Sequence, residues 1–185
     1  MRIRPEISIL CYLEGELRER YLHDMRLCQR WAVLNRELIA RLLLRFFGIA
    51  DATSVPMFES VHNYIGDDNL IRKGSISAAK GERCIIPLNM RDGSLLCTGK
   101  GNDDWNCSAP HGAGRVLSRS EANKRITMED FRESMEGIYS ESVTESTLDE
   151  SPMAYKPSDE IIANIVDTVD IDTIIRPVFN FKANN

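Results

Sequence analysis

The longest uninterrupted periodic pattern in the chain lies between Leu17 and Phe47. Apolar residues recur there at steps of three and four, and neither Gly nor Pro interrupts them. This spacing predicts an amphipathic helix with Gly48 as its C-terminal stop. About 30 residues would make a rod of roughly 45 Å, which in a small protein usually spans one face of a larger body. We interpret His23, which lies in this pattern, as an ordinary helical residue.

Shorter elements are predicted along the rest of the chain. Thr127 and Asp130 have the spacing of a capping box, which predicts a helix that runs to about Met135. The other expectations are strands at 71–76, 83–88 and 93–98, a loop at 98–113, a solvated acidic loop at 140–151, an amphipathic helix at 160–169 and a final strand at 174–182. This mixture indicates an α+β fold. With no internal repeat and no evident linker, we expect residues 1–185 to form one domain.

Composition excludes several classes of protein. Hydrophobic residues make up 43% of the chain and charged residues 28%, which is typical of a globular domain and not of a disordered or collagenous one. No run approaches the roughly 20 apolar residues of a membrane span, and residues 1–6 do not resemble a secretion signal. We therefore expect no membrane partner, a cytoplasmic location and reduced thiols for the five cysteines.

Charge is distributed unevenly along the chain. Residues 60–125 contain ten basic and seven acidic residues, whereas residues 126–173 contain two basic and thirteen acidic ones. The sequence pI of about 5.3 argues mildly against a nonspecific nucleic-acid-binding domain. An anionic ligand is accordingly expected to bind in the middle third.

The segment Ser108–Arg119 is the densest in candidate chemistry. His111 precedes residues 112–114, Gly-Ala-Gly, whose backbone could contact a ligand closely and offer N–H donors. Arg115 and Arg119 are four residues apart, so on a helix that starts here they would share a face and form an anion site. A histidine at the mouth of a phosphate site is a candidate nucleophile at phosphorus. The alternative is a Gly-rich turn with a hydrogen-bonded histidine.

His62 is a second candidate, although a single histidine is more often a packed or hydrogen-bonded residue than a metal ligand. No second ligand stands at a metal-binding spacing beside it. Any metal that it bound would need ligands from elsewhere.

The string Ser108-Ala109-Pro110-His111-Gly112-Ala113-Gly114-Arg115-Val116-Leu117-Ser118-Arg119 resembles the signature of the RtcB family of RNA-splicing ligases. The resemblance extends in order from about Leu13 to the end. Further matching blocks are Val61–Tyr64, Arg72–Gly74, Ile86–Ser94, Gly101–Asn106, Asp149–Lys156 and Arg176–Ala183.

The resemblance implies an RtcB-like mixed fold, with a long helix and short strands around a nucleotide pocket. It also implies an RNA ligase that uses GTP and manganese. Such an enzyme joins an RNA 2′,3′-cyclic phosphate or 3′-phosphate end to a 5′-hydroxyl end, in RNA repair or tRNA splicing. His111 matches the histidine that attacks the GTP α-phosphate and forms a histidine–GMP intermediate, from which GMP moves to the RNA 3′-phosphate.

Other roles are implied position by position. His62 matches a manganese ligand. The matches to nucleotide contacts are Asn63, Pro87, Leu88, Asn89, Met90, Ser94, His111, Gly112, Ala113, Gly114, Tyr155 and Lys182. The matches to contacts with RNA or GTP phosphates are Lys73, Arg115 and Arg119. Plainer interpretations stand beside these: Ser94 could end a strand, Tyr155 could pack and Lys182 could belong to a solvated tail.

The sequence departs from the family in length. Family members carry a first half with an Asp, a Cys and further histidines that complete the manganese site, and no segment of this sequence matches it. We therefore expect the C-terminal part of a single ligase domain that is inactive alone and has a separate N-terminal half as a possible partner. One alternative is a noncatalytic remnant with a partial GTP- and RNA-binding surface. Another is an unrelated nucleotidyl or phosphoryl transferase that uses His111.

Overall fold

The computed structural model of the chain describes residues 12–49 and 51–182. Contacts divide the chain into two compact units, Met1–Met57 and Phe58–Asn185. The expectations about the first eleven residues, including Cys11 and the absence of a secretion signal, lie outside the described residues. Helices and small antiparallel sheets occur together, which confirms the α+β class. Among the described residues, no helix has the length and apolar character needed to cross a membrane.

The first unit contains the predicted long helix. Helix α1 runs from Gly15 to Phe46, and Gly48 follows it at φ +80°, a conformation that favours glycine after a helix end. Leu22 is the one buried residue described in α1. Apolar side chains that remain exposed on this segment include Leu17, Tyr21, Leu27, Trp31, Leu34, Leu38, Ile39, Leu42, Leu43, Phe46 and Phe47.

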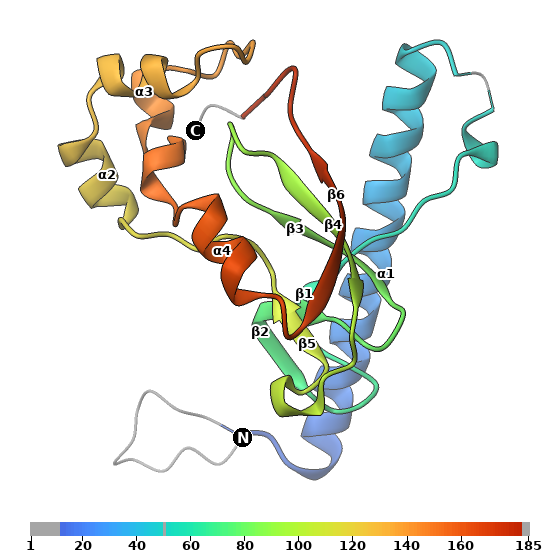
Figure 1. Ribbon diagram of the computed structural model, residues 1–185. Helices are drawn as coiled ribbons and strands as arrows, with labels where there is room; N and C mark the ends of the chain where they lie inside the picture. Colours follow the sequence, from blue (N-terminus) through green and yellow to red (C-terminus); the bar gives the residue numbers. More distant parts are fainter. Residues whose placement is uncertain (1–11, 50, 183–185) are drawn as a thin grey trace. The chain divides into compact units, whose positions relative to one another are not determined.

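The second unit contains two three-stranded antiparallel sheets (Figure 1). The first has the order β1-β2-β5, with β1 at His62–Ile65, β2 at Ile71–Ser77 and β5 at Ser108–Pro110. The second has the order β3-β4-β6, with β3 at Arg83–Pro87, β4 at Ser94–Gly99 and β6 at Val169–Ile175. The strands predicted at 71–76, 83–88 and 93–98 are therefore confirmed as β2, β3 and β4.

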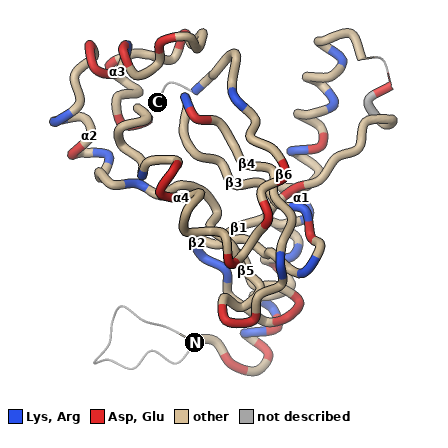
Figure 2. Tube along the Cα trace, viewed as in Figure 1, with Lys and Arg blue, Asp and Glu red and all other residues tan. Residues whose placement is uncertain are grey.

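Short helices complete the second unit: α2 at Arg119–Arg125, α3 at Met128–Ser134 and α4 at Ser158–Asn164. The capping box of α3 is confirmed, because Thr127 accepts a hydrogen bond from the Asp130 amide and Asp130 accepts one from the Thr127 amide. Figure 2 shows acidic residues on α3 and α4, in the part of the chain with the acidic excess.

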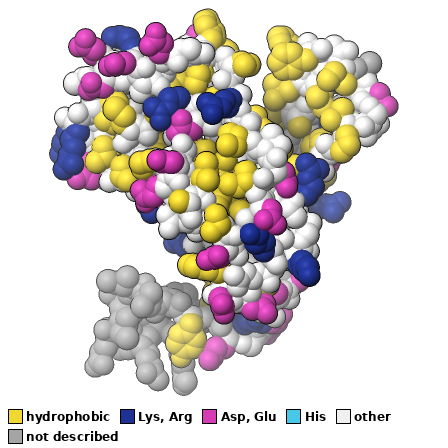
Figure 3. Space-filling view, in the orientation of Figure 1, with side chains coloured by type: hydrophobic (Ala, Val, Ile, Leu, Met, Phe, Trp, Pro, Cys, Tyr) yellow, Lys and Arg dark blue, Asp and Glu magenta, His cyan; other side chains and the backbone are white. Residues whose placement is uncertain are grey.

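Two apolar clusters form the core of the second unit. In one, Ile86 and Leu95 of the β3-β4 hairpin pack with Ile165 near the end of α4. The other surrounds Phe131 of α3, which is fully buried. Figure 3 shows apolar side chains gathered on one face over the middle of this unit.

The predicted elements near the C-terminus are displaced. Helix α4 ends at Asn164 and does not reach residue 169, because a turn follows in which the Thr168 and Val169 amides donate to the Ile165 carbonyl. The last strand occupies 169–175 and not 174–182, since its partners on β4 start at Gly99 opposite Val169. Pro177, which has no N–H to donate, lies just beyond the strand end.

Two predicted loops also contain more structure than expected. Residues 145–150 form a 3₁₀ turn, and Ser142, Thr147, Asp149 and Ser151 are buried, so the prediction of a solvated loop at 140–151 was wrong. Local hydrogen bonds permit this burial: the Thr147 hydroxyl donates to the Ser142 carbonyl. The loop predicted at 98–113 contains a 3₁₀ turn at Asp103–Trp105 and strand β5.

Arg115 does not lie on a helix with Arg119, as the four-residue spacing predicted. Helix α2 begins only at Arg119, because Ser118 and Glu121 form a capping box that sets its start. Arg115 instead forms an isolated antiparallel bridge with Tyr155, next to which the Val116 amide donates to the Ala154 carbonyl at 2.9 Å.

The exposed apolar surface of α1 generates a first prediction. Exposed apolar surface of this extent promotes association, so we expect the unchanged chain to self-associate. Leu38 and Leu42 lie one turn apart, and replacing both with Lys should disrupt the apolar surface of α1 and shift the chain toward the monomer. Size-exclusion chromatography with light scattering measures this change. His23 and Asn35 are exposed polar residues of the same helix, and replacing both with Lys is the matched control. Equal self-association in the two double variants would contradict the prediction.

Candidate functional site

The β1-β2-β5 sheet brings two of the three histidines together. His62 begins β1 opposite Ile76 of β2, and Pro110 ends β5 opposite Ser75 of β2. The residue after Pro110 is His111, whose amide lies 3.5 Å from the Gly74 carbonyl oxygen. The His62 and His111 ring centroids are 5.1 Å apart.

Small residues let the backbone pass closely around His111. Gly74 has a φ of +76°, and a Cβ there would lie 4.0 Å from the His111 Nε2 atom. A Cβ on Gly112 would lie 3.1 Å from the Pro87 carbonyl oxygen, and Gly114 has a φ of +72°. The Ala113 amide donates to that Pro87 oxygen at 3.1 Å. Residues 112–114 are thereby held against the end of β3.

The environment of His111 favours its neutral form. Burial lowers the pKa of this imidazole, and the nearby His62 lowers it further. A neutral imidazole keeps a nitrogen lone pair, which a nucleophile requires.

A cavity of about 720 Å³ opens beside His111, within the size range of small-molecule sites. Most of the residues predicted from the resemblance line it: His62, Pro87, Leu88, Asn89, Met90, Ser94, His111, Gly112, Ala113, Gly114, Arg115, Tyr155 and Lys182. Three predicted residues do not. The Asn63 side chain accepts a hydrogen bond from the Gly74 amide at 3.2 Å, Lys73 is exposed on β2, and Arg119 is mostly exposed at the start of α2.

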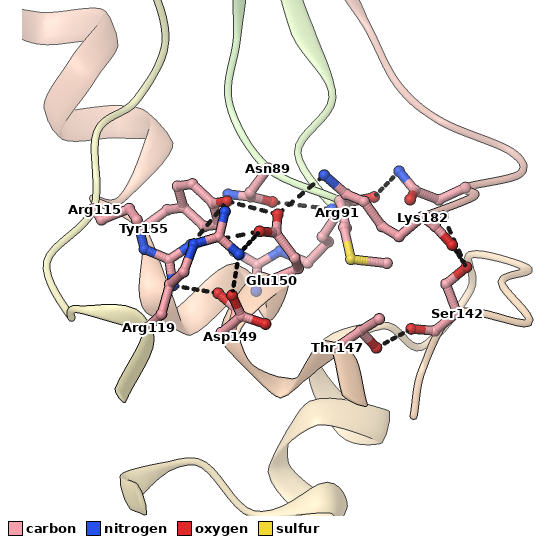
Figure 4. Close-up of polar contacts among 12 residues, drawn as sticks. Asn89, Arg91, Arg115, Arg119, Ser142, Thr147, Asp149, Glu150, Tyr155 and Lys182 are labelled. Atoms are coloured by element: carbon pink, nitrogen blue, oxygen red, sulfur yellow. Dashed lines mark hydrogen bonds and ion pairs between the residues drawn. The ribbon is translucent and has the colours of Figure 1, made fainter. Parts of the chain in front are cut away.

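One end of this cavity is organised around the Glu150 carboxylate (Figure 4). Its Oε2 atom accepts hydrogen bonds from the Tyr155 hydroxyl at 2.8 Å and the Lys182 ammonium at 3.1 Å. Its Oε1 atom lies 3.6 Å from Arg115 Nη1 and 3.5 Å from Arg119 Nη1. Burial alone would raise the pKa of Glu150, but the hydrogen bonds from Tyr155 and Lys182 outweigh it and the net shift is downward. Glu150 is therefore ionised near neutral pH.

The pKa of Tyr155 shifts in the opposite direction to that of Glu150. Burial and the hydrogen bond to Glu150 raise the pKa of its phenol to about 12. The phenol consequently stays protonated and serves as a donor to Glu150.

The donors of Arg115 are engaged within the protein. Its Nε atom donates to the Leu117 carbonyl at 3.1 Å and its Nη1 atom to the Tyr155 hydroxyl at 3.3 Å. Its Nη2 atom donates to the Asp149 carbonyl, and the guanidinium lies over the Tyr155 ring. Arg119 forms an ion pair of 2.6 Å with the Asp149 carboxylate, so both arginines converge on residues 149 and 150 although only Arg119 is helical.

Comparisons with known proteins identify relatives of this chain. A family model described as "tRNA-splicing ligase RtcB" matches residues 5–183. The Escherichia coli K12 protein named "RNA-splicing ligase RtcB" is 30% identical over 194 residues, covering 96% of this chain and 47% of the relative. The Aeropyrum pernix "tRNA-splicing ligase RtcB" is 35% identical over 106 residues, covering 53% of this chain and 22% of the relative.

The chain belongs to the RtcB family. It spans about half the length of the Escherichia coli relatives that it matches.

For this RtcB-family chain, the structure adds cavity residues that the sequence did not indicate: Gly93, Glu150, Ile175, Pro177 and Asn180. Glu150 and Asn180 lie inside blocks that resemble the family, so those blocks were a usable signal. Their convergence with residues more than 30 positions away was not visible in the sequence.

The residues described do not complete a metal site around His62. Within 12–49 and 51–182, no group of three His, Cys, Asp or Glu side chains is placed to hold a metal ion. His62 is therefore a single candidate nitrogen ligand, and further ligands would be needed to bind a metal ion beside it.

The two adjacent histidines generate a second prediction. Replacing His62 with Asn should raise the pKa of His111, since it removes the neighbouring positive charge, but should leave it below the ordinary value because burial is the larger cause. NMR titration of the imidazole signals measures the shift. His23→Asn, in α1, is the control and should leave His111 unchanged. A His111 titration that does not move in His62→Asn would contradict the prediction.

Proposed function

We propose that this chain contributes the nucleophile and the nucleotide-binding wall of a GTP-dependent RNA ligase. The ligase would join RNA 2′,3′-cyclic phosphate or 3′-phosphate ends to 5′-hydroxyl ends. The observation that carries the proposal is His111, whose neutral form is favoured, at the edge of a nucleotide-sized cavity and backed by the close-lying residues 112–114.

The covalent step would proceed at the His111 ring. A ring nitrogen attacks the α-phosphorus of GTP, a P–N bond forms, and the bond to the pyrophosphate oxygen breaks. The RNA 3′-phosphate then takes GMP from the histidine, and attack by the 5′-hydroxyl releases GMP. The Ala113 amide already donates to Pro87 and positions the loop, so Gly112 and Gly114 are the proposed source of backbone donors to a ligand.

The remaining proposed contacts to the nucleotide lie at several places along the cavity. Residues 87–90 and Ser94 border it on the β3-β4 hairpin, and Tyr155 and Lys182 border it at the Glu150 end. Asn63 would act near the nucleotide from the start of β1. Lys73, Arg115 and Arg119 are proposed contacts of RNA or GTP phosphates.

Manganese and RNA are the proposed cofactor and substrate. Bound metal ions would offset phosphate charge, and His62 could provide one nitrogen. The other ligands would come from outside the described residues, and a separate N-terminal half is the proposed source. A noncatalytic remnant that retains part of a GTP- and RNA-binding surface is the second candidate, because the described residues include no group of three metal-binding side chains.

Guanylation tests the proposal directly. In the presence of a complementing N-terminal RtcB segment, manganese and labelled GTP, the chain should acquire a covalent label. His111→Ala should abolish it because the attacking nitrogen is lost, whereas His23→Ala should retain it; gel autoradiography measures both. Labelling of His111→Ala would overturn the assignment of the nucleophile.

Substitutions of Arg119 test whether this residue contacts an RNA phosphate. Its exposed guanidinium can bind a phosphate with its planar fork, so Arg119→Ala should slow the joining of a preactivated RNA end more than it slows guanylation. The slope of log binding constant against log salt concentration should fall by about one. Arg119→Lys should restore joining only in part. Arg125→Ala, at the other end of α2, is the matched control, and equal loss in the two Ala variants would contradict the role of Arg119.

A further inference from the structure

Arg119 and Arg125 lie at the two ends of α2, and their guanidinium groups are held differently. The two side chains are similarly exposed, at 64% and 65%. Arg125 pairs at 3.4 Å with Glu121, an exposed residue of the same helix, as in an ordinary surface ion pair. Arg119 Nη1 instead donates at 2.6 Å to the carboxylate of Asp149, a buried residue from another part of the chain (Figure 4). A buried partner restricts Arg119 more than an exposed one would.

Local structure orders the backbone on both sides of this contact. Arg119 is the first residue of α2, whose start is fixed by a capping box. Asp149 lies in the 3₁₀ turn Glu145–Glu150, at whose end the Ser151 amide donates to the Leu148 carbonyl at 3.2 Å. Bonds other than the ion pair thus place the two residues opposite each other.

The contact occupies only one nitrogen of the Arg119 guanidinium. Its Nη1 atom lies 2.6 Å from Asp149 and 3.5 Å from Glu150 Oε1. Among the described residues, its Nε and Nη2 atoms have no hydrogen-bond partner. These two nitrogens carry parallel N–H groups, which match two oxygens of a phosphate. In Arg115, by contrast, all three guanidinium nitrogens donate to groups of the protein. Of the two arginines, Arg119 is therefore the one with an edge left for a ligand.

We infer that Asp149 is a positioning residue, whose carboxylate holds Arg119 Nη1 so that the Nε–Nη2 edge is presented to a phosphate of the RNA. The inference rests on the proposed role of Arg119 as a phosphate contact and assigns the residue that orients it. A carboxylate close to a phosphate repels it, so electrostatic repulsion alone would make Asp149 unfavourable here. Its orienting effect has the opposite consequence, because an arginine without this partner regains its rotamer freedom.

Steady-state joining of a preactivated RNA end, by the whole chain with a complementing N-terminal RtcB segment, tests this inference. Asp149→Asn keeps the shape of the side chain and removes its charge. We expect kcat to fall about tenfold, the effect of one lost hydrogen bond to a charged group, without a rise in KM. In the Arg119→Ala background, Asp149→Asn should have no further effect on kcat. The matched control is Asp170→Asn, which removes a carboxylate that pairs with Lys100 at 3.1 Å and should leave kcat and KM unchanged.

The arginine Nε–H signals provide a second measurement, which needs neither RNA nor a second chain. NMR relaxation should show an ordered Arg119 side chain and a mobile Arg125 side chain, although their exposure is similar. Asp149→Asn should make Arg119 as mobile as Arg125. Equal mobility of the two arginines in the unchanged chain would overturn the inference, and this comparison holds even if Asp149→Asn fails to fold.

Each contrary result of the joining experiment has a distinct meaning. A lower KM with an unchanged kcat in Asp149→Asn overturns the inference, because the carboxylate would then only repel RNA. An equal fall in kcat with and without Arg119→Ala also overturns it, because Asp149 would then act through the fold and not through Arg119. Both results leave the proposed function intact. Failure of the unchanged chain to acquire GMP or to join ends overturns the proposed function itself, and the inference with it.

Discussion

The hydrogen bond from the Ala113 amide to the Pro87 carbonyl joins the two sheets of the second unit around one cavity. Pro87 is the last residue of β3, and residues 111–114 follow β5 of the other sheet. Glycine at 112 favours this joint, because a Cβ there would lie 3.1 Å from the same carbonyl oxygen and one of the two groups would have to shift. The position of His111 at the cavity edge depends on this close approach. The small residues of this string thus serve close packing as well as possible ligand contacts.

Residues from the acidic and basic parts of the sequence form ion pairs with each other at the Glu150 end of the cavity. Asp149 and Glu150 come from the acidic stretch and meet Arg115 and Arg119 from the basic one. Lys182 is the third cation beside the Glu150 carboxylate. The three cations offset the burial cost of the Glu150 carboxylate, and removing that carboxylate would leave Lys182 and the partly buried Arg115 without this partner. We expected the basic middle third of the sequence to bind an anionic ligand, but much of its positive charge is neutralised within the protein.

Local patterns in the sequence predicted local structure well. The periodicity of α1, the Thr127 capping box and the β3-β4 strands depend on residues that are close in sequence. The shift of the last strand depends on pairing with β4, some 70 positions earlier, which no short window contains. The resemblance recovered most of the cavity lining. It did not single out Glu150 and Asn180, which contact Lys182 and Met90 far along the chain.

The distribution of charge around the cavity explains why a nucleophile alone would not complete the proposed chemistry. Among the described lining residues, the only lysine and arginine are Lys182 and Arg115, and both lie against Glu150. Asn89, Ser94 and Asn180 add uncharged polar groups to the described lining, and the proximity of His62 already lowers the pKa of His111. A triphosphate placed for attack by His111 would therefore meet little positive charge from this wall. Charge compensation for that group must come from ions or residues beyond it, because phosphoryl transfer depends mainly on positioning and electrostatic stabilisation.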